Sequence, residues 1–384
     1  MPNRIGIITY VRVNNYGAEL QAFALQRKMQ LMGYDAEIID YPFGLSPLHK
    51  SFGEKLSVPV SMKERIRCNV LVLVHWFIRC RYPRNQEKRN CNFLEFHKKH
   101  SKMSNRQIRS LKGLYKANFD YDIYCVGSDQ VWNYSMGSSL LPYFLDFVKD
   151  GAKKISYASS IGLSNLDNTA AKIYREYLSK FDSLSVREQQ AAVLLKQILG
   201  RDVNVVLDPT LLLCVDEWRK VASYNDCPQD KYLLLYVVTI KPCEYAVNLA
   251  EYIARAKGWK IVRLSGSAST RGHREGIIEK PSVGPDGFVG LIDKAELVVT
   301  NSFHGTVFSL NFETPFFTVV NPRKNNNSRM QNILTRVGLA DRMIEIGGDY
   351  PSIEKIECNF EGVAHELSTE REDSVSYLKS ALDK

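Results

Sequence analysis

Short apolar stretches alternate with stretches of helical periodicity from the start of this 384-residue chain. Residues 5–10 are apolar, residues 18–32 repeat apolar side chains at helical spacing as far as Gly33, and residues 36–41 are largely apolar again. A strand, a helix and a second strand in this order form a βαβ unit, in which the strands are parallel. The opening of the chain therefore predicts a parallel sheet covered by helices.

The alternation continues in two sets and predicts an α/β protein with two doubly wound, parallel-sheet domains. Further strands are expected at residues 121–126, 155–161, 183–186, 203–207, 232–239, 260–264, 297–300 and 316–320. The hinge-like sequence Asp208-Pro209-Thr210 divides an N-terminal domain, residues 1–210, from a C-terminal domain, residues 211–384. Two such domains facing a cleft make a GT-B-like architecture, and the cleft is the expected ligand site. A helix expected at residues 370–382 can cross back onto the first domain.

Residues 43–118 interrupt the alternation with a basic, helical insertion. From Lys63 to Lys116 there are fifteen Lys and Arg against three acidic residues, a surplus of 15 − 3 = 12, whereas the whole chain carries +9. This charge fits a solvated helical face, a surface for anionic lipid head groups or a lipid diphosphate, or nucleic acid; no recognised motif favours the last. The apolar residues 68–78 are too few to span a bilayer, and fit a buried or an interfacial helix.

The composition excludes several other classes of protein. With 45% hydrophobic and 24% charged residues, and without an apolar run of about 18 residues, the chain is expected to be a globular cytoplasmic protein. Its eight cysteines form no C-x-x-C pair, so neither a zinc site nor a redox pair is expected. The chain also lacks a P-loop and a G-x-G-x-x-G turn after its first strand, which disfavours ATP and NAD.

The sequence Asn301-Ser302-Phe303-His304-Gly305-Thr306-Val307 is the strongest candidate for a functional site. It lies between the strand expected at residues 297–300 and a helix, and such turns carry the ligands of open parallel sheets. The free N–H groups of the helix favour an anion there. His304, one of seven histidines, can hold a proton near neutral pH while facing that anion.

Polar residues also follow other expected strands. Residues 14–21 and 127–133 offer side chains that suit sugar hydroxyls, with Trp132 as an aromatic face; helix caps and ordinary turns are the alternative explanation, and residues 158–162 are weak evidence by themselves. Arg187 follows the strand at residues 183–186, where it either grips an anion or pairs with Glu188 or another acid. The loops at residues 266–287 and 322–329 are expected to be mobile and to bring further cations to the cleft.

Taken in order along residues 5–340, these motifs resemble those of the polysaccharide pyruvyl transferase family. The pieces that match are Asn14-Asn15-Tyr16-Gly17-Ala18-Glu19-Leu20-Gln21-Ala22, Val126-Gly127-Ser128-Asp129-Gln130-Val131-Trp132-Asn133, Tyr157-Ala158-Ser159-Ser160-Ile161-Gly162, Ser185-Val186-Arg187-Glu188, Val206-Leu207-Asp208-Pro209-Thr210 and Thr300-Asn301-Ser302-Phe303-His304-Gly305. The resemblance implies a GT-B-like fold and transfer of pyruvate from phosphoenolpyruvate to a sugar, giving a ketal and phosphate. Some members have an arginine where this chain has Ser302, so another cation, Arg329 or Lys324, must meet the phosphate.

The resemblance and the residues together give one hypothesis for the site. His304 is the general acid/base, because the unperturbed pKa of an imidazole, roughly 6.5, suits proton transfer, and Arg187 clamps the donor's carboxylate or phosphate. The residues expected at the donor are Arg187, Asn301, Ser302, His304, Gly305, Lys324 and Arg329. The residues expected at the acceptor are Asn15, Tyr16, Gly17, Gln21, Ser128, Asp129, Gln130, Asn133 and Ser160. No metal or cofactor besides phosphoenolpyruvate is expected.

The acceptor and two rival functions stay open. Repeat units of polysaccharides are often carried on a lipid diphosphate, and the basic segment suits peripheral contact with an anionic membrane at its cytoplasmic face. One rival is a GT-B glycosyltransferase that uses a nucleotide sugar, although no acidic residue is evident for the ribose. The other is a non-catalytic sugar-binding protein, which remains an alternative because Ser302 stands where some family members have an arginine.

Overall fold

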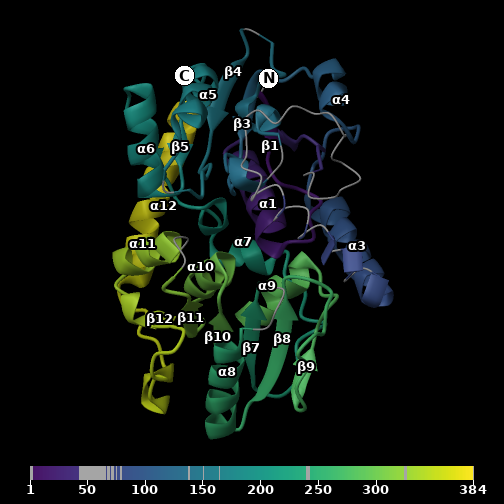
Figure 1. Ribbon diagram of the computed structural model, residues 1–384, viewed down its shortest axis with the longest axis vertical. Helices are drawn as coiled ribbons and strands as arrows, with labels where there is room; N and C mark the ends of the chain where they lie inside the picture. The colour runs from purple at the N-terminus through teal and green to yellow at the C-terminus, as the bar shows by residue number, and fades with distance from the viewer. Residues whose placement is uncertain are drawn as a thin grey trace.

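Two α/β units stacked along the long axis make up the computed structural model (Figure 1). It describes residues 3–42, 66, 70, 73–74, 76–77, 80–136, 139–149, 151–163, 165–238, 243–323 and 327–383. Among these residues, no helix is both long enough and apolar enough to cross a bilayer. The fold is GT-B, as predicted from the alternation of strands and helices.

The N-terminal sheet has the strand order β2-β1-β3-β4, with all neighbours parallel. Its strands are β1 (Arg4–Ile8), β2 (Asp35–Ile38), β3 (Ile123–Val126) and β4 (Lys153–Ser156). The parallel pair β5 (Ser185–Val186) and β6 (Asn204–Val205) continues it through single bridges from β4 and the loop after it. The helices of this unit are α1 (Tyr16–Leu31), α5 (Asn168–Leu178) and α6 (Gln189–Leu199).

The C-terminal sheet has the order β12-β11-β10-β7-β8-β9, again all parallel. Its strands are β7 (Tyr232–Val237), β8 (Lys260–Ser265), β9 (Ile277–Glu279), β10 (Leu297–Thr300), β11 (Phe316–Val320) and β12 (Met343–Glu345). Its helices are α7 (Val215–Arg219), α8 (Glu244–Lys257), α9 (Pro285–Asp293), α10 (Phe303–Phe312) and α11 (Ser328–Arg336).

The strand order reverses between β7 and β10 in the second sheet and between β1 and β3 in the first. Connections at such a switch point run to opposite faces of the sheet and leave a crevice at the carboxyl ends of the strands. α10 follows β10 and α1 follows β1 directly, so each helix begins at its sheet's crevice. The switch points therefore explain why these two helix N-termini face the junction between the units.

The C-terminal helix α12 (Val363–Asp383) crosses from the second unit back onto the first (Figure 1). Leu378, Ala381 and Leu382 join the apolar cluster of β1, β2 and β3. Ser374 accepts a hydrogen bond from the Leu207 amide at 3.0 Å, and the Tyr377 hydroxyl donates to the Ser156 carbonyl at 3.1 Å. α12 thus fastens the end of the chain to the N-terminal sheet.

The described part of the basic insertion includes α3 (Pro83–His100) and α4 (Leu111–Lys116). α3 lies at the junction, where Arg89 is only 1% exposed. Its guanidinium donates to the Asn14 carbonyl at 3.1 Å, the Tyr16 hydroxyl at 2.9 Å and the Pro281 carbonyl at 3.1 Å. This helix of the insertion therefore ties the loop after β1 to the second unit.

Two expectations about loops were wrong, and one strand was not expected. Residues 266–287, expected to be a mobile loop, contain β9 and the start of α9, and residues 343–345 form the unexpected strand β12. β9 and β12 have three residues each and lie at the two edges of the sheet, so they lack the long apolar run that marks an inner strand. Arg329, expected in a mobile loop, lies in the first turn of α11.

Candidate active site

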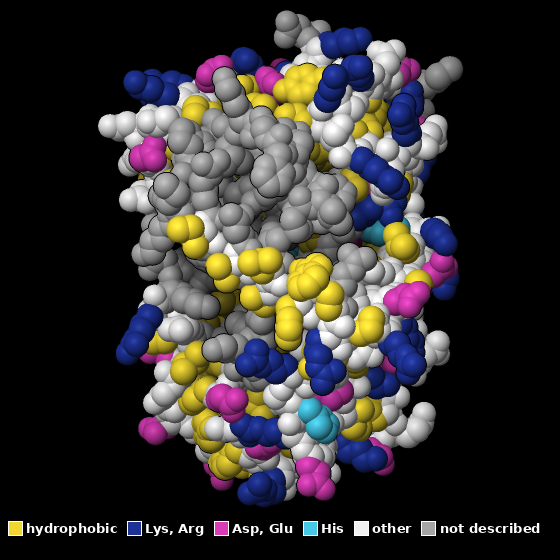
Figure 2. Space-filling view, turned by 45° about the vertical axis from the view of Figure 1, so that its right-hand side comes forward, with side chains coloured by type: hydrophobic (Ala, Val, Ile, Leu, Met, Phe, Trp, Pro, Cys, Tyr) yellow, Lys and Arg dark blue, Asp and Glu magenta, His cyan; other side chains and the backbone are white. Residues whose placement is uncertain are grey.

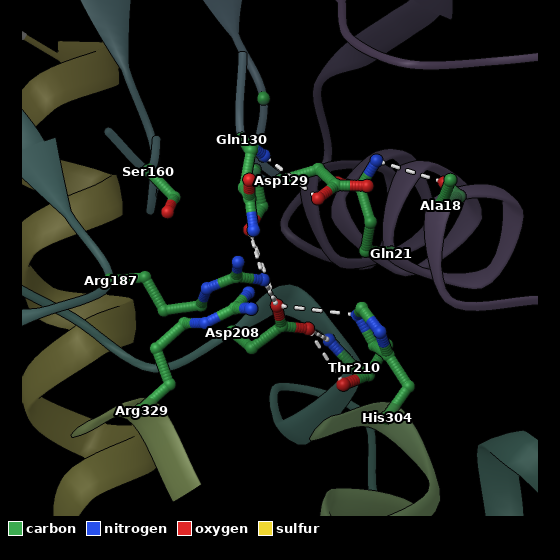
Figure 3. A network of polar contacts seen from close by, with 12 residues as sticks. Ala18, Gln21, Asp129, Gln130, Ser160, Arg187, Asp208, Thr210, His304 and Arg329 are labelled. Carbon is green, nitrogen blue, oxygen red and sulfur yellow. Dashed lines mark hydrogen bonds and ion pairs between the residues drawn. The ribbon is translucent and has the colours of Figure 1, made fainter. Parts of the chain in front are cut away.

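Arg187, Asp208 and His304 meet at the junction of the two units (Figure 3). Arg187 follows β5, Asp208 precedes the 3-10 turn Pro209–Leu211, and His304 lies in the first turn of α10. Asp208 Oδ2 accepts a hydrogen bond from Arg187 Nη1 at 2.7 Å and lies 3.7 Å from His304 Nε2. One buried carboxylate therefore connects an arginine of the first unit with a histidine of the second.

Asp208 is held in place by neighbouring donors. Its Oδ1 accepts hydrogen bonds from the Thr210 amide at 3.0 Å and the Thr210 hydroxyl at 2.7 Å, and its Oδ2 accepts one from Ser128 at 3.2 Å. Burial alone raises the pKa of the Asp208 carboxyl, but His304 and Arg187 outweigh burial and hold this pKa well below its usual range. Asp208 is thus a fixed negative charge at working pH.

Arg187 is buried but keeps donor capacity. Burial lowers the pKa of its guanidinium, and Asp208 and Glu188 raise it by more, so the group stays charged. Its Nε lies 3.6 Å from Glu188, and its Nε and Nη2 make no hydrogen bond within the described residues. Arg187 therefore pairs with acids, which is one of the two alternatives from the sequence, and its binding of an anion stays a prediction.

A second guanidinium, that of Arg329, lies beside Arg187 (Figure 3). Both stack on the Phe303 ring, with Arg187 Cζ at 4.8 Å and Arg329 Cζ at 5.4 Å from the ring centroid. Arg329 Nε is 3.9 Å from Glu188. Burial, followed by the charge of Arg187, lowers the pKa of Arg329, which means that its surroundings disfavour the cation. Two adjacent cations, one buried and the other largely buried, repel each other, and an anionic ligand between them would lower this repulsion.

The His304 ring packs directly on Gly17 at the start of α1, where a Cβ would overlap the imidazole. Asn15 caps this helix, its side-chain oxygen accepting from the Ala18 amide at 3.3 Å. His304 is 9% exposed, and its Nε2 has no hydrogen-bond partner within the described residues. The close approach of Gly17 therefore leaves the histidine ring at the boundary between the units.

The residues around His304 shape the turn from β10 into α10. Ser302 is the N-cap, accepting from the Gly305 amide at 3.4 Å, and Asn301 accepts from the Val238 amide at 2.8 Å. A Cβ at Gly305 would overlap Thr300, so only glycine fits there. Asn301, Ser302 and Gly305 thus position the histidine. The side chains of Asn301 and Ser302 accept hydrogen bonds from the protein's own backbone.

The polar loop after β3 and the helix α1 form the opposite wall of the site, with Gln21, Asp129 and Gln130 facing it (Figure 3). Asn133 donates to Gln130 at 2.8 Å, and Asp129 takes a left-handed backbone with φ of 75°. Gln21 donates to Thr9 at 3.0 Å, and its buried carbonyl oxygen makes no hydrogen bond within the described residues. Three expected acceptor residues, Gln21, Asp129 and Gln130, therefore lie near the charged cluster.

Ser128, in the loop after β3, and Ser160, in the loop after β4, are already hydrogen-bonded within the protein. Ser128 donates to Asp208, as noted, and Ser160 donates to Glu188. Both are fully buried. These two serines therefore act first as supports for the acidic side chains of the site.

Two aromatic residues differ from their expected roles. Tyr16 is fully buried between Phe93 and Phe288, and its hydroxyl donates to the Val283 carbonyl at 3.0 Å. Trp132 is also fully buried, and its indole donates to the Tyr143 carbonyl at 2.8 Å, so its interpretation as a stacking face for a sugar was wrong. Lys324 lies outside the described residues.

Asp208, Glu188 and Thr210 belong to the site but were not named as site residues from the sequence. The sequence did contain a signal for this part of the site, because Asp208-Pro209-Thr210 follows an expected strand. These three residues were interpreted as a hinge between the domains instead. The described residues contain no group of three or more His, Cys, Asp and Glu side chains arranged to hold a metal ion. The site that is described is therefore built from charged and hydrogen-bonding side chains.

Comparison with solved structures shows that the protein has the GT-B fold. A protein of Listeria monocytogenes described as a UDP-N-acetylglucosamine 2-epimerase is 11% identical over 100% of this chain and 97% of its own, with a TM-score of 0.52. The UDP-GlcNAc 2-epimerase of Neisseria meningitidis is also similar, with 9% identity over 98% of this chain and 94% of its own and a TM-score of 0.49. The spinosyn rhamnosyltransferase SpnG is 10% identical over 100% of this chain and 100% of its own, with a TM-score of 0.46. At these identities the likeness shows the fold alone.

The sequence itself identifies the family. The model of the polysaccharide pyruvyl transferase family matches residues 15–322, which include Arg187, Asp208 and His304. The chain belongs to this family, and the resemblance seen in its motifs is confirmed. Comparison with curated proteins finds no match.

Proposed function

We propose that the protein transfers pyruvate from phosphoenolpyruvate to a sugar of a polysaccharide or of a lipid-linked repeat unit. The product is a pyruvate ketal that bridges two hydroxyls, and phosphate is released. The observation that carries the proposal is the meeting of Arg187, Arg329 and His304 at the domain junction of a chain that belongs to the pyruvyl transferase family. Neither a metal nor a further cofactor is part of the proposal, and nucleic acid is not a partner in it.

Two cations suit a donor with two anionic groups. Phosphoenolpyruvate carries a carboxylate and a phosphate on the same carbon atom, and guanidinium groups bind both in two-pronged fashion. In the proposal, the donors of Arg187 that make no hydrogen bond meet one group and Arg329 meets the other. Arg329 thereby supplies the cation that some family members carry at the position of Ser302.

The chemistry requires protons to move at four atoms. The methylene carbon of phosphoenolpyruvate gains a proton, and its neighbouring carbon becomes electrophilic and is attacked by a sugar hydroxyl, which loses its proton. The C–O bond to phosphate then breaks, phosphate leaves with one proton, and a second hydroxyl attacks the same carbon while losing its own. Overall, two hydroxyl protons are lost and are recovered on the methyl group and on phosphate.

His304 is the proposed acid/base in these steps. An imidazole can exchange a proton near neutral pH, and Asp208, 3.7 Å from its Nε2, stabilises the charged ring. Asp208 cannot serve as the acid itself, because its pKa lies well below the usual range. We assign Asp208 a positioning role for both His304 and Arg187.

The acceptor is proposed to lie against the wall formed by Gln21, Asp129 and Gln130. These side chains face the cluster across the junction and offer amide and carboxylate groups that suit vicinal hydroxyls (Figure 3). Asn15 and Asn133 support the wall, since their side chains bond within it, whereas Ser128 and Ser160 hold Asp208 and Glu188. The loops following β1 and β3 thus become the acceptor side.

A nucleotide-sugar glycosyltransferase is the second candidate, because the same fold occurs in such enzymes and the α10 N-terminus would suit a diphosphate. Phosphorus NMR distinguishes the two. Phosphoenolpyruvate incubated with the protein and a panel of sugars should be converted to inorganic phosphate only when an acceptor is present. His304→Ala should slow this conversion by a factor of about 100 or more. Consumption of a nucleotide sugar instead would overturn the proposal, and binding without turnover would favour a sugar-binding protein.

A further inference from the structure

A row of large apolar side chains is exposed in the chain just before α3. Ile66, Val70, Leu73 and Phe77 have helical backbone, and their exposed fractions are 58, 51, 63 and 63%. The intervals of four, three and four residues place them on one side of a helix. Trp76, next to Phe77, is 62% exposed. We call these five residues the apolar face; large apolar side chains concentrated in this way usually mark an interaction surface.

The surroundings of the apolar face are cationic. In the sequence, Arg65 and Arg67 precede the uncharged residues 68–78, and Arg79 and Arg81 follow them. Arg81 is exposed, as are Arg84 and Lys88 at the start of α3. Figure 2 shows this side of the molecule, where apolar side chains gather across the middle and Lys and Arg side chains are widespread. Apolar residues with tryptophan between arginines are typical of helices that lie in the head-group region of a bilayer.

From these two features we infer that the apolar face docks the protein on an anionic lipid bilayer. The apolar side chains enter the boundary of the acyl chains, and the arginines contact the lipid phosphates. Charge argues for this occupant over a second copy of the chain, because a second copy would bring the same basic segment and a like net charge of +9. The docking is peripheral, in keeping with the lack of a membrane-spanning helix among the described residues.

α3 connects the apolar face to the domain junction. Within α3, Arg89 donates to the loop before α1, and Asn92 donates to the Ser282 carbonyl of the second unit at 2.7 Å. A bilayer bound at the apolar face therefore lies on the α3 side of the junction. Delivery of a lipid-linked acceptor there rests on the proposed function, whereas docking itself does not.

Flotation with vesicles tests the inference directly. Wild-type protein is mixed with vesicles of phosphatidylcholine alone, or of equimolar phosphatidylcholine and phosphatidylglycerol, at about 0.05 M and about 0.5 M salt. The double variant Leu73→Ser/Phe77→Ser removes two exposed apolar side chains and should fold normally. The matched control is Val193→Ser, which changes a 49% exposed residue on α6. Fluorescence of Trp76, with Trp76→Phe as reference, reports insertion independently of flotation.

We expect wild type and Val193→Ser to float with the anionic vesicles at low salt, and the double variant to bind at least tenfold more weakly. The Trp76 emission should shift to shorter wavelength only with anionic vesicles. Equal binding of the double variant would overturn the inference, as would protein that stays unbound with both vesicle types. Dimerisation lost in the double variant, without vesicle binding, would assign the face to a second copy and equally overturn it. Because no donor is present, these outcomes are independent of the pyruvyl transfer proposal.

Discussion

Gly17 at the start of α1 and His304 at the start of α10 are in direct contact across the junction of the two domains. A Cβ at position 17 would overlap the imidazole ring, so glycine is required for the helices to meet as they do. Each residue lies at the switch point of its own sheet, and neither sheet forms the site without the other. The proposed chemistry therefore depends on the way in which the domains are joined.

Replacement of Gly17 by alanine tests this contact. The added methyl group must displace the His304 ring, and misplacement of an acid/base by about 1 Å can cost a factor of about 100 in rate. We expect Gly17→Ala to slow sugar-dependent phosphate release by at least about tenfold while leaving the fold intact by circular dichroism. The control is Gly348→Ala in the second domain, where the atom nearest to the new Cβ is the Glu345 carbonyl oxygen at 3.3 Å. Unchanged turnover in Gly17→Ala would show that the contact is irrelevant to catalysis.

Arg329 is expected to contribute to the binding of phosphoenolpyruvate but not to the stability of the free protein. Burial and the neighbouring Arg187 lower the pKa of Arg329, so its charge is disfavoured in the free protein. We expect Arg329→Gln to leave the unfolding midpoint unchanged or to raise it, and to weaken phosphoenolpyruvate binding by about 10- to 100-fold, as expected for a lost charge-assisted hydrogen bond. Calorimetry and thermal unfolding measure the two effects. Arg219→Gln, which removes a half-exposed ion pair with Asp293, is the control. Unaltered binding in Arg329→Gln would remove Arg329 from the donor site.

The difference in unfolding free energy between the wild type and Asp208→Asn is expected to depend on pH. The substitution leaves the buried Arg187 without its closest carboxylate, and loss of one partner of a buried pair costs about 3 kcal/mol. Because the folded-state pKa of Asp208 lies below the unfolded value of about 3.9, its stabilisation is complete above that pH and is lost as the pH falls further.

The unfolding free energies of the wild type and Asp208→Asn should therefore differ clearly above about pH 5 and converge below about pH 4. Urea titrations at several pH values measure this difference. A gap that does not shrink below about pH 4 would mean that ionised Asp208 does not supply the stabilisation.

Arg89 joins the basic insertion to both domains. Its three hydrogen bonds, to the Asn14 carbonyl, the Tyr16 hydroxyl and the Pro281 carbonyl, have no replacement in Arg89→Ala. Buried acceptors left without a partner cost about 1–3 kcal/mol each, so we expect a loss of roughly 3 kcal/mol in unfolding free energy. Chemical denaturation measures it, with the exposed Arg84→Ala on the same helix as control. Equal stability of the two variants would mean that α3 does not hold the domains together.

The sequence predicted the fold because its inner strands are uniformly apolar. Leu297-Val298-Val299-Thr300, for instance, reads as a buried parallel strand, and β10 occupies these residues. The turn after such a strand was accordingly located, and His304 with it. The outer strands β9 and β12 were missed because three residues at a sheet edge leave almost no pattern to detect.

Contacts between distant segments account for most of what could not be predicted at the site. Tyr16 looks like a ligand-binding residue in a loop, but Phe93 from the insertion and Phe288 from the second domain enclose it. Asp208 becomes part of a charged cluster only because the fold brings Arg187 and His304 to it. Local patterns describe turns and caps, whereas these pairings depend on how the two domains pack.

Calorimetric titration with phosphoenolpyruvate tests the central claim most directly. We predict saturable binding at one site per chain, weakened at least about tenfold in Arg187→Lys, which keeps the charge but loses the planar fork of donors. A nucleotide sugar titrated under the same conditions should give no saturable heat. Saturable binding of the nucleotide sugar, with no heat from phosphoenolpyruvate, would contradict the account.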